Sequence, residues 1–431
     1  DPLPLVVGQQ QGQGPPPLPP TQLVRNKKAH SRHCSGPSQP QGSRNLRASD
    51  LIAELLNAAE KSAEVARAIR REETLFQLLI EEKTGDDKGK RFGFDFKTLA
   101  DVLIQEMIRH DLEKKFSGMG KRVTGEENNK FTNIVGESVT VEIKDNKKKT
   151  MSTLMKILSG NDRAAGVLSE LVHQDVTVPR PAELQKFESI QLDKKTIGVW
   201  VDPIDGTAEY ITGNRDPEFR PGENISQNGL PNVTVLIGVY EKATGLPIIG
   251  VINQPFFQTT DGKAWTGRMV WGACIGDVRA TCLPMARSEP LLAEGDKHAV
   301  LTSMSDCKKL GTYLCENFEV LTAPGAGYKL LCVIDRLCSA YVLSKDNTYR
   351  WDTCAPHAIL RAMGGGVVKH KQTLSADFKA KRDQSVRELQ ITYHKAEPKA
   401  AGSNAWCNMQ GVIAYCDEEV LMKLAESLTR K

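Results

Sequence analysis

A short apolar strand leads directly into a pair of acidic residues near the middle of this chain. Residues 197–201 are apolar apart from one glycine, and the six residues that follow are Asp202-Pro203-Ile204-Asp205-Gly206-Thr207. A short apolar run of this kind is typical of a buried strand, and the proline predicts where that strand stops. The sequence therefore places two carboxylates at the end of a strand, with a predicted helix starting at Gly206 and Thr207.

Asp202 and Asp205 suit a magnesium site. Pro203 stiffens the link between them, so that both carboxylates can point into one site. Carboxylate and carbonyl oxygens are the hard ligands that Mg²⁺ prefers. The backbone N–H groups of Gly206 and Thr207 would have no partner inside a helix that begins there, which suits a phosphate. Metal ligands next to phosphate contacts predict metal-assisted hydrolysis of a phosphate ester. The structural alternative is an Asp-Pro turn in which one aspartate caps the helix.

Three further acidic positions fit the same chemistry. Asp101 lies in the first turn of a predicted helix, Glu126 follows Thr124-Gly125, and Asp352 begins another predicted helix. Each has an ordinary alternative, because a carboxylate complements the dipole at a helix start and the pair Glu126-Glu127 is typical of an exposed loop. Their occurrence together with the Asp-Pro motif favours one shared acidic site.

Periodicity and turn residues predict the other main elements. Apolar residues recur at helical spacing in residues 51–80, with a break expected near Arg71. The remaining predictions are a helix at 98–115, strands at 232–240 and 247–253 with a turn at Thr244-Gly245, and a helix at 353–363 that ends at Gly364.

Residues 1–47 differ from the rest of the chain in composition. They are rich in Gln, Gly, Pro and Ser and carry almost no periodic apolar pattern, so we predict a disordered extension. The run from Pro15 to Pro20 contains a PxxP motif, which favours polyproline II and is typical of a ligand for an SH3-type domain. We favour an extension without a partner and keep the SH3-type partner as the alternative.

The charge balance argues against a nucleic-acid partner. Six of the 57 basic residues but only two of the 53 acidic residues lie in residues 1–50, which leaves 51 of each sign in the remainder. A nucleic-acid-binding domain usually carries a strong basic excess. No run approaches the roughly 18 consecutive apolar residues of a membrane-spanning helix, and the ten cysteines form no CxxC pair. We expect a monomeric cytoplasmic protein with free thiols and no membrane partner.

The acidic positions resemble the signature of the lithium-sensitive, magnesium-dependent phosphomonoesterases. That superfamily includes inositol monophosphatase, fructose 1,6-bisphosphatase and the 3′-phosphoadenosine phosphatases. The matching residues are Asp101, the Gly-Glu-Glu of 125–127, the motif at 202–207 and Trp351-Asp352. Segments similar to the branch that acts on inositol polyphosphates are 75–83, 95–103, 172–176, 325–329 and 357–366, and the resemblance runs from about Ser49 to the last residue.

The resemblance implies an α/β (α+β) layered sandwich with the order α-β-α-β-α. Residues 48–285 are expected to form an α+β metal-binding domain with a mostly antiparallel sheet. Residues 286–431 are expected to form a smaller α/β domain.

The resemblance also implies roles for individual residues. Two or three Mg²⁺ ions are expected, with the side chains of Asp101, Glu126, Asp202, Asp205 and Asp352 and the backbone carbonyl of Ile204 as ligands. Asp101 and Thr207 are expected to orient and deprotonate the attacking water. The expected substrate contacts are Asp205, Gly206, Thr207, Gly325, Ala326 and Lys329.

Two departures from the branch concern substrate preference. Close members of the branch carry serine at the position of Gly206, so one side-chain contact is missing here. A serine–lysine substrate pair near residues 303–308 is interrupted by Met304 and Asp306.

The implied substrates are inositol 1,4-bisphosphate and then inositol 1,3,4-trisphosphate, with inhibition by lithium. Water would attack directly, because the sequence has no His-Cys-x5-Arg loop and the two histidines near the matching segments, His173 and His357, are interpreted as structural. A 3′(2′),5′-bisphosphate nucleotidase is the enzymatic alternative. A non-catalytic scaffold that acts through the proline-rich extension is the alternative from another class.

Overall fold

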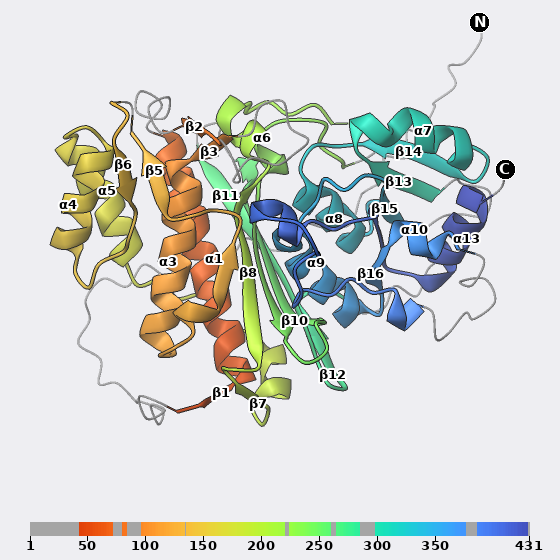
Figure 1. Ribbon diagram of the computed structural model, residues 1–431, viewed down its shortest axis with the longest axis horizontal. Helices are drawn as coiled ribbons and strands as arrows, with labels where there is room; N and C mark the ends of the chain where they lie inside the picture. The colour runs from red at the N-terminus through yellow and green to blue at the C-terminus, as the bar shows by residue number, and fades with distance from the viewer. Residues whose placement is uncertain are drawn as a thin grey trace, which may run out of the picture.

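Helices and β-sheets alternate in five layers in the computed structural model of the chain (Figure 1). The structure describes residues 43–71, 80–83, 96–133, 135–219, 224–259, 264–284, 298–375 and 386–429. The six-stranded sheet has the order β12-β11-β10-β9-β8-β4, and the five-stranded sheet has the order β14-β13-β15-β17-β16. This arrangement confirms the predicted α-β-α-β-α sandwich.

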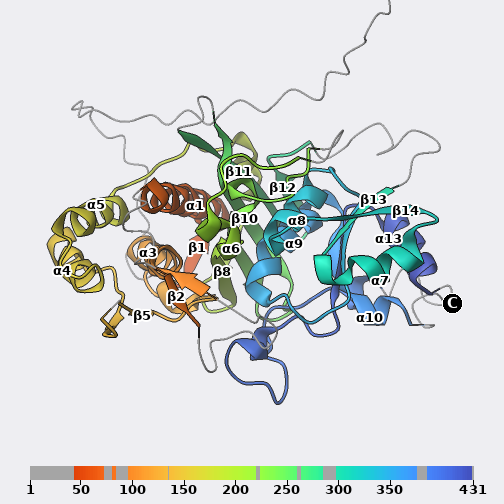
Figure 2. The ribbon, with the colours of Figure 1, turned by 90° about the horizontal axis from the view of Figure 1, so that it is seen from above.

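The first sheet is antiparallel except where β4 runs parallel to β8. Its strands are β4 (Val123–Gly125), β8 (Ile197–Asp205), β9 (Thr234–Glu241), β10 (Pro247–Thr259), β11 (Trp265–Ile275) and β12 (Val278–Thr281). Two helices cover one face, α1 (Ala48–Arg71) and α3 (Leu99–Lys115), and α4 (Lys147–Ile157) and α5 (Asp162–His173) lie outside them. Figure 2 shows α4 and α5 at the opposite end of the molecule from the C-terminus.

The second sheet is mixed, because β13 pairs in parallel with β14 and β15, whereas β17 runs antiparallel to both of its neighbours. Its strands are β13 (His298–Thr302), β14 (Phe318–Thr322), β15 (Ala340–Leu343), β16 (Gly366–Lys369) and β17 (Val412–Tyr415). Two helices lie between the sheets, α8 (Ala326–Ile334) and α9 (Arg350–Met363), and the outer layer consists of α7 (Met304–Leu314) and α13 (Glu418–Thr429).

Short elements complete the described chain. The small strand pairs are β1 (Asn45–Arg47) with β7 (Gln191–Asp193), β2 (Ile80–Glu82) with β3 (Phe96–Thr98), and β5 (Lys130–Thr132) with β6 (Ser138–Thr140). The short helices are α6 (Thr207–Thr212), α10 (His370–Thr373) and the 3-10 turns at Gly120–Arg122, Ala182–Phe187, Leu230–Asn232 and Gly402–Trp406.

The start of α3 follows from a capping box. The backbone N–H of Thr98 donates to Asp101 Oδ2 at 2.6 Å, and the N–H of Asp101 donates to the Thr98 hydroxyl at 3.4 Å. Each side chain thus satisfies a backbone group that the first turn leaves unpaired. Leu99, Leu103 and Met107 are buried, as the helical spacing predicts.

Three glycines in register allow α9 to lie close against the first sheet. Gly250 on β10 is paired with Gly238 on β9 and with Gly272 on β11. A Cβ at Gly238 would lie 2.6 Å from the backbone nitrogen of Ala355, and a Cβ at Gly250 would clash with the carbonyl oxygen of the same residue. The helix backbone therefore packs directly on the strand backbones.

Two expectations from the sequence differ from the structure at the edges of elements. The helix predicted for 51–80 spans Ala48–Arg71, residues 72–79 lie outside the described residues, and Ile80 begins β2. The helical spacing did not extend to Ile80 because pairing of β2 with β3 fixes that residue in a strand. Most of the predicted extension also lies outside the described residues, but Asn45–Arg47 pair with β7 and Leu46 is buried.

The predicted division at residue 285 falls between the two sheets but does not separate their cores. Residues 285–297 lie outside the described residues. One core cluster joins Trp200 and Leu236 of the first sheet to Leu301 and Tyr341 of the second. The division into domains therefore stays a prediction.

Two findings bear on the expected surroundings of the protein. No helix in the described part of the chain has both the length and the apolar character needed to cross a bilayer. The nine cysteines within the described ranges are free thiols. The cytoplasmic location and the monomeric state stay predictions.

His357 should make the stability of the protein sensitive to acid. Its ring is buried in α9, with Nδ1 3.0 Å from the Tyr393 hydroxyl and Nε2 2.7 Å from Gln390 Oε1. Burial lowers the pKa of His357 to about 3, against roughly 6.5 in an unfolded chain. Between these values the unfolded chain binds a proton that the folded protein does not, so the free energy of unfolding decreases as the pH falls below about 6.5.

We expect this histidine to contribute a slope of about 1.4 kcal/mol per pH unit between pH 6 and pH 4. The measurement is the free energy of unfolding in urea at several pH values for the protein and for His357→Gln, which keeps a hydrogen-bonding group without the titration. The variant should lose less stability across this range. Equal slopes for the two proteins would show that His357 does not contribute.

Candidate metal and phosphate site

A β-bulge at the end of β8 brings Asp202 and Asp205 onto the same side of the strand. Asp202 pairs with Leu236 and Asp205 pairs with Thr234, and the register shifts between them. Residues three apart in a regular strand point to opposite faces, whereas a bulge re-aims side chains. The sequence predicted that the strand stops at Pro203, but β8 continues to Asp205. The bulge accommodates the proline, which has no N–H to donate to the neighbouring strand.

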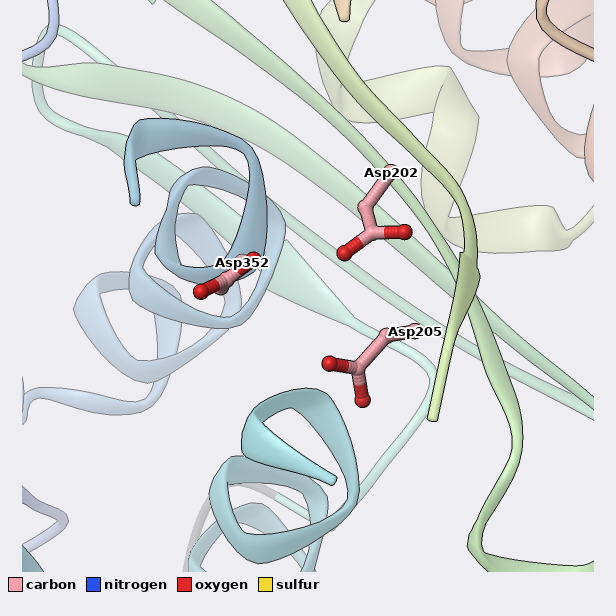
Figure 3. Close-up of side chains that lie close together, drawn as sticks. All are labelled: Asp202, Asp205 and Asp352. Atoms are coloured by element: carbon pink, nitrogen blue, oxygen red, sulfur yellow. The ribbon is translucent and has the colours of Figure 1, made fainter. Parts of the chain in front are cut away.

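Asp352 completes a group of three carboxylates. It lies in the first turn of α9, where its Oδ2 accepts a hydrogen bond from the backbone N–H of Tyr349 at 2.8 Å. Figure 3 shows the three side chains directed toward a common space, two from β8 and one from the helix. One carboxylate oxygen from each of Asp202, Asp205 and Asp352 lies within 4.8 Å of the others. This spacing allows a single cation to contact all three.

The three carboxylates are buried and repel one another. Burial is the main cause that raises the pKa of Asp202, with the charges of Glu126, Asp205 and Asp352 added to it. Burial likewise raises the pKa of Asp205 to about 6 and raises the pKa of Asp352. Asp202 is 1% exposed, and its Oδ1 has no hydrogen-bond partner among the described residues. A buried carboxylate oxygen without a hydrogen-bond partner is costly, so this group of acids fits a divalent cation.

Asp205 also ties the two halves of the molecule together. Its Oδ1 accepts a hydrogen bond from the backbone N–H of Ala326 at 3.2 Å, and its Oδ2 accepts one from Gly327 at 2.9 Å. The first turn of α8 is thereby fixed against the end of β8. Gly327 was not predicted as a site residue, and no local feature of the sequence indicated this contact.

Asp101 and Glu126 belong to the same electrostatic site but do not join the group of three. Asp101 is buried at the start of α3, and burial is the main cause that raises its pKa to about 7. Its Oδ2 accepts from Thr98, whereas its Oδ1 has no partner in the described part of the chain. Glu126 lies 2.5 Å from the Lys83 ammonium. The charges of both acids act on Asp202.

A cavity of about 630 Å³ opens beside these carboxylates. It is lined by all six predicted substrate contacts, which are Asp205, Gly206, Thr207, Gly325, Ala326 and Lys329. The Thr207 hydroxyl donates to the carbonyl oxygen of Ile204 at 3.0 Å. The Lys329 ammonium donates to the carbonyl oxygens of Ala323 at 2.9 Å and Gly325 at 2.7 Å, and burial lowers its pKa to about 8.

The cavity is also lined by residues that were not predicted as substrate contacts. Ser303 and Met304 line it, and Met304 is 78% exposed. Asp306 does not line the cavity, and its Oδ2 accepts a hydrogen bond from the backbone N–H of Ser344 at 2.7 Å. Other lining residues that were not predicted include Glu209, Glu218, Gln227, Asn228 and Tyr341.

Comparison with known proteins identifies a family and several relatives. The model of the inositol monophosphatase family matches residues 118–418. Inositol polyphosphate 1-phosphatase of Mus musculus is 44% identical over 379 residues, which cover 85% of this chain and 94% of that protein. The Homo sapiens protein of that name is 41% identical over 382 residues, with 85% and 94% covered. 3′(2′),5′-Bisphosphate nucleotidase 1 of Rattus norvegicus is 30% identical over 345 residues, with 79% and 89% covered.

Among solved structures, the extragenic suppressor protein suhB of Bartonella henselae is similar, with a TM-score of 0.46 and 14% sequence identity. The match covers 88% of this chain and 99% of that chain. The acidic site and the sequence relatives define a phosphoric monoester hydrolase of a metal-dependent class. The chain belongs to the inositol monophosphatase family.

Proposed function

We propose that this protein is a Mg²⁺-dependent phosphatase that removes the 1-phosphate of inositol 1,4-bisphosphate and of inositol 1,3,4-trisphosphate, and that lithium inhibits it. The observation that carries the metal dependence is the buried group of Asp202, Asp205 and Asp352 beside a cavity large enough for a small phosphorylated molecule. The choice of substrate rests on the relatives named inositol polyphosphate 1-phosphatase.

The proposed metal ligands are Asp101, Glu126, Asp202, Asp205 and Asp352, together with the carbonyl oxygen of Ile204, for two or three Mg²⁺ ions. Bound Mg²⁺ would lower the pKa of water and offset the negative charge of the phosphate ester. The set of hard oxygen donors suits Mg²⁺. Burial, together with the charges of neighbouring carboxylates, raises the pKa values of Asp202, Asp205 and Asp352, so a bound cation would stabilise their ionised forms.

Asp101 and Thr207 are proposed to orient the attacking water and take up its proton. The Thr207 hydroxyl donates to Ile204, which leaves its oxygen lone pairs free to accept a hydrogen bond from water. Asp101 Oδ1 is buried without a partner among the described residues, so it is available to accept a proton from water. Both groups thus fit proton transfer from water.

The remaining contacts concern the substrate. Gly206 and Thr207 line the cavity next to the carboxylates and are proposed to contact the phosphate that is removed. Lys329 is proposed to hold a second phosphate, with Gly325 and Ala326 beside the ring. The N–H of Ala326 already donates to Asp205, so its contribution to substrate binding would come from its position and not from that donor.

The test is phosphate release from inositol 1,4-bisphosphate and from 3′-phosphoadenosine 5′-phosphate, measured side by side in Mg²⁺ with and without Li⁺. We expect faster, lithium-sensitive release from the inositol phosphate, and no release after chelation of the metal. Preference for the nucleotide would contradict the substrate and favour the activity named for the 30% identical relatives. No release from either substrate would contradict the phosphatase proposal and favour a scaffold.

A further inference from the structure

A buried lysine lies on two neighbouring carboxylates at the edge of the acidic site. The Lys83 ammonium is 2.5 Å from Glu126 Oε1 and 2.7 Å from Glu127 Oε1, and Lys83 is 5% exposed. Its position follows from β2, which ends at Glu82 and pairs with β3, the strand that leads into α3. The ammonium is therefore held on the same elements that place Asp101.

The two carboxylates are themselves held at a fixed backbone position. The backbone N–H of Glu126 donates to the carbonyl oxygen of Val201 on β8 at 3.1 Å. The Gln105 side chain bonds Glu127 twice, by donating to its carbonyl oxygen at 2.5 Å and by accepting from its N–H at 3.1 Å. Because this backbone is fixed on both sides, a cation that binds Glu126 has to share the carboxylate with Lys83 or replace it there.

We propose that Lys83 competes with the divalent cation for Glu126 and thereby lowers the affinity of that end of the acidic site. This inference rests on the proposed metal dependence. Two cations on one carboxylate repel each other strongly in a partly buried site. Glu127 gives the ammonium a second carboxylate on which to remain when a cation binds Glu126.

The test is titration of the metal-free protein with Mg²⁺ by calorimetry. In Lys83→Met the dissociation constant of Mg²⁺ at the site that includes Glu126 should decrease about tenfold, because one competing charge has been removed. In Glu127→Gln the same constant should increase several-fold, because Glu127 no longer shares the ammonium with Glu126. The matched control is Lys97→Met, which removes another 5% exposed lysine that contacts Lys130 and Glu81 on neighbouring strands. Its constants should not change.

The opposite signs keep the result separate from a general loss of fold, which would weaken binding in both variants. Unchanged or weaker binding in Lys83→Met would overturn the inference, because Lys83 would then only position Glu126 or support the fold. If the unmodified protein shows no Mg²⁺ binding, the proposed function fails, and the inference fails with it. The calorimetric result does not depend on turnover, so the two failures can be distinguished.

Discussion

Asp202→Asn will lower the rate of phosphate release by roughly 10³-fold, which is the order found when one electrostatic contact to a reacting group is lost. The same substitution will not lower the melting temperature of the metal-free protein. Burial and the charges of Glu126, Asp205 and Asp352 raise the pKa of Asp202, so its ionised form is unfavourable in the folded state without a cation. A neutral amide relieves that repulsion but removes an oxygen anion from the metal site. Activity and metal-free stability should therefore respond differently.

The measurements are phosphate release at saturating Mg²⁺ and thermal unfolding in chelator. Asp111→Asn is the matched control, since Asp111 lies toward the other end of α3 from Asp101 and pairs with the Lys61 ammonium at 2.7 Å. Burial acts to raise the pKa of Asp111, but the hydrogen bond with His110 and the Lys61 ammonium together lower it below its usual value. Loss of this carboxylate should therefore reduce stability and leave turnover unchanged. A marked drop in melting temperature for Asp202→Asn would contradict the electrostatic argument.

Gly250→Ala will destabilise the protein by about 3 kcal/mol, at the upper end of the usual cost of overpacking. The added methyl group would clash with the carbonyl oxygen of Ala355, which belongs to the backbone of α9 and cannot rotate away. The helix would have to move off the sheet, and it carries Asp352. We therefore expect a lower activity per folded molecule as well, measured together with unfolding in urea.

Gly311→Ala is the control for this substitution. Gly311 lies in α7, and a Cβ there would meet nothing within 4 Å. Alanine at such a position usually favours the helix by about 0.5–1 kcal/mol. If Gly250→Ala unfolds at the same urea concentration as the unmodified protein, the close packing of α9 on β10 does not contribute to stability.

Elements whose ends depend on neighbouring residues were predictable from the sequence. The predicted start of α3 at residue 98 lies one residue before the observed start at Leu99, and Gly364 ends α9 in the left-handed conformation, as the sequence predicted. The pairing of β9 with β10 was likewise predictable, because the turn at Thr244-Gly245 is local. In each case, the residues that decide the structure lie within a few positions of the boundary.

Features that depend on distant segments were not predictable. The bulge at Pro203 exists because β9 pairs on both sides of it, and the sequence alone indicated a strand that stops. Asp202, Asp205 and Asp352, three of the five predicted carboxylate ligands, lie together in the structure, but the ion pair of Glu126 with Lys83 was missed. No local pattern links a residue after β2 to one after β4.

The glycine row on β9, β10 and β11 has a consequence for how the protein folds. Hairpin pairing between β9 and β10 closes only a short loop, whereas contact between Gly250 and Ala355 closes a long loop. Closing a long loop costs chain entropy before the contact contributes any stabilising energy. We therefore expect Asp352 to meet Asp202 and Asp205 late, when the sheet already exists. A cation bound by these three carboxylates would then stabilise the fully folded protein relative to partly folded forms.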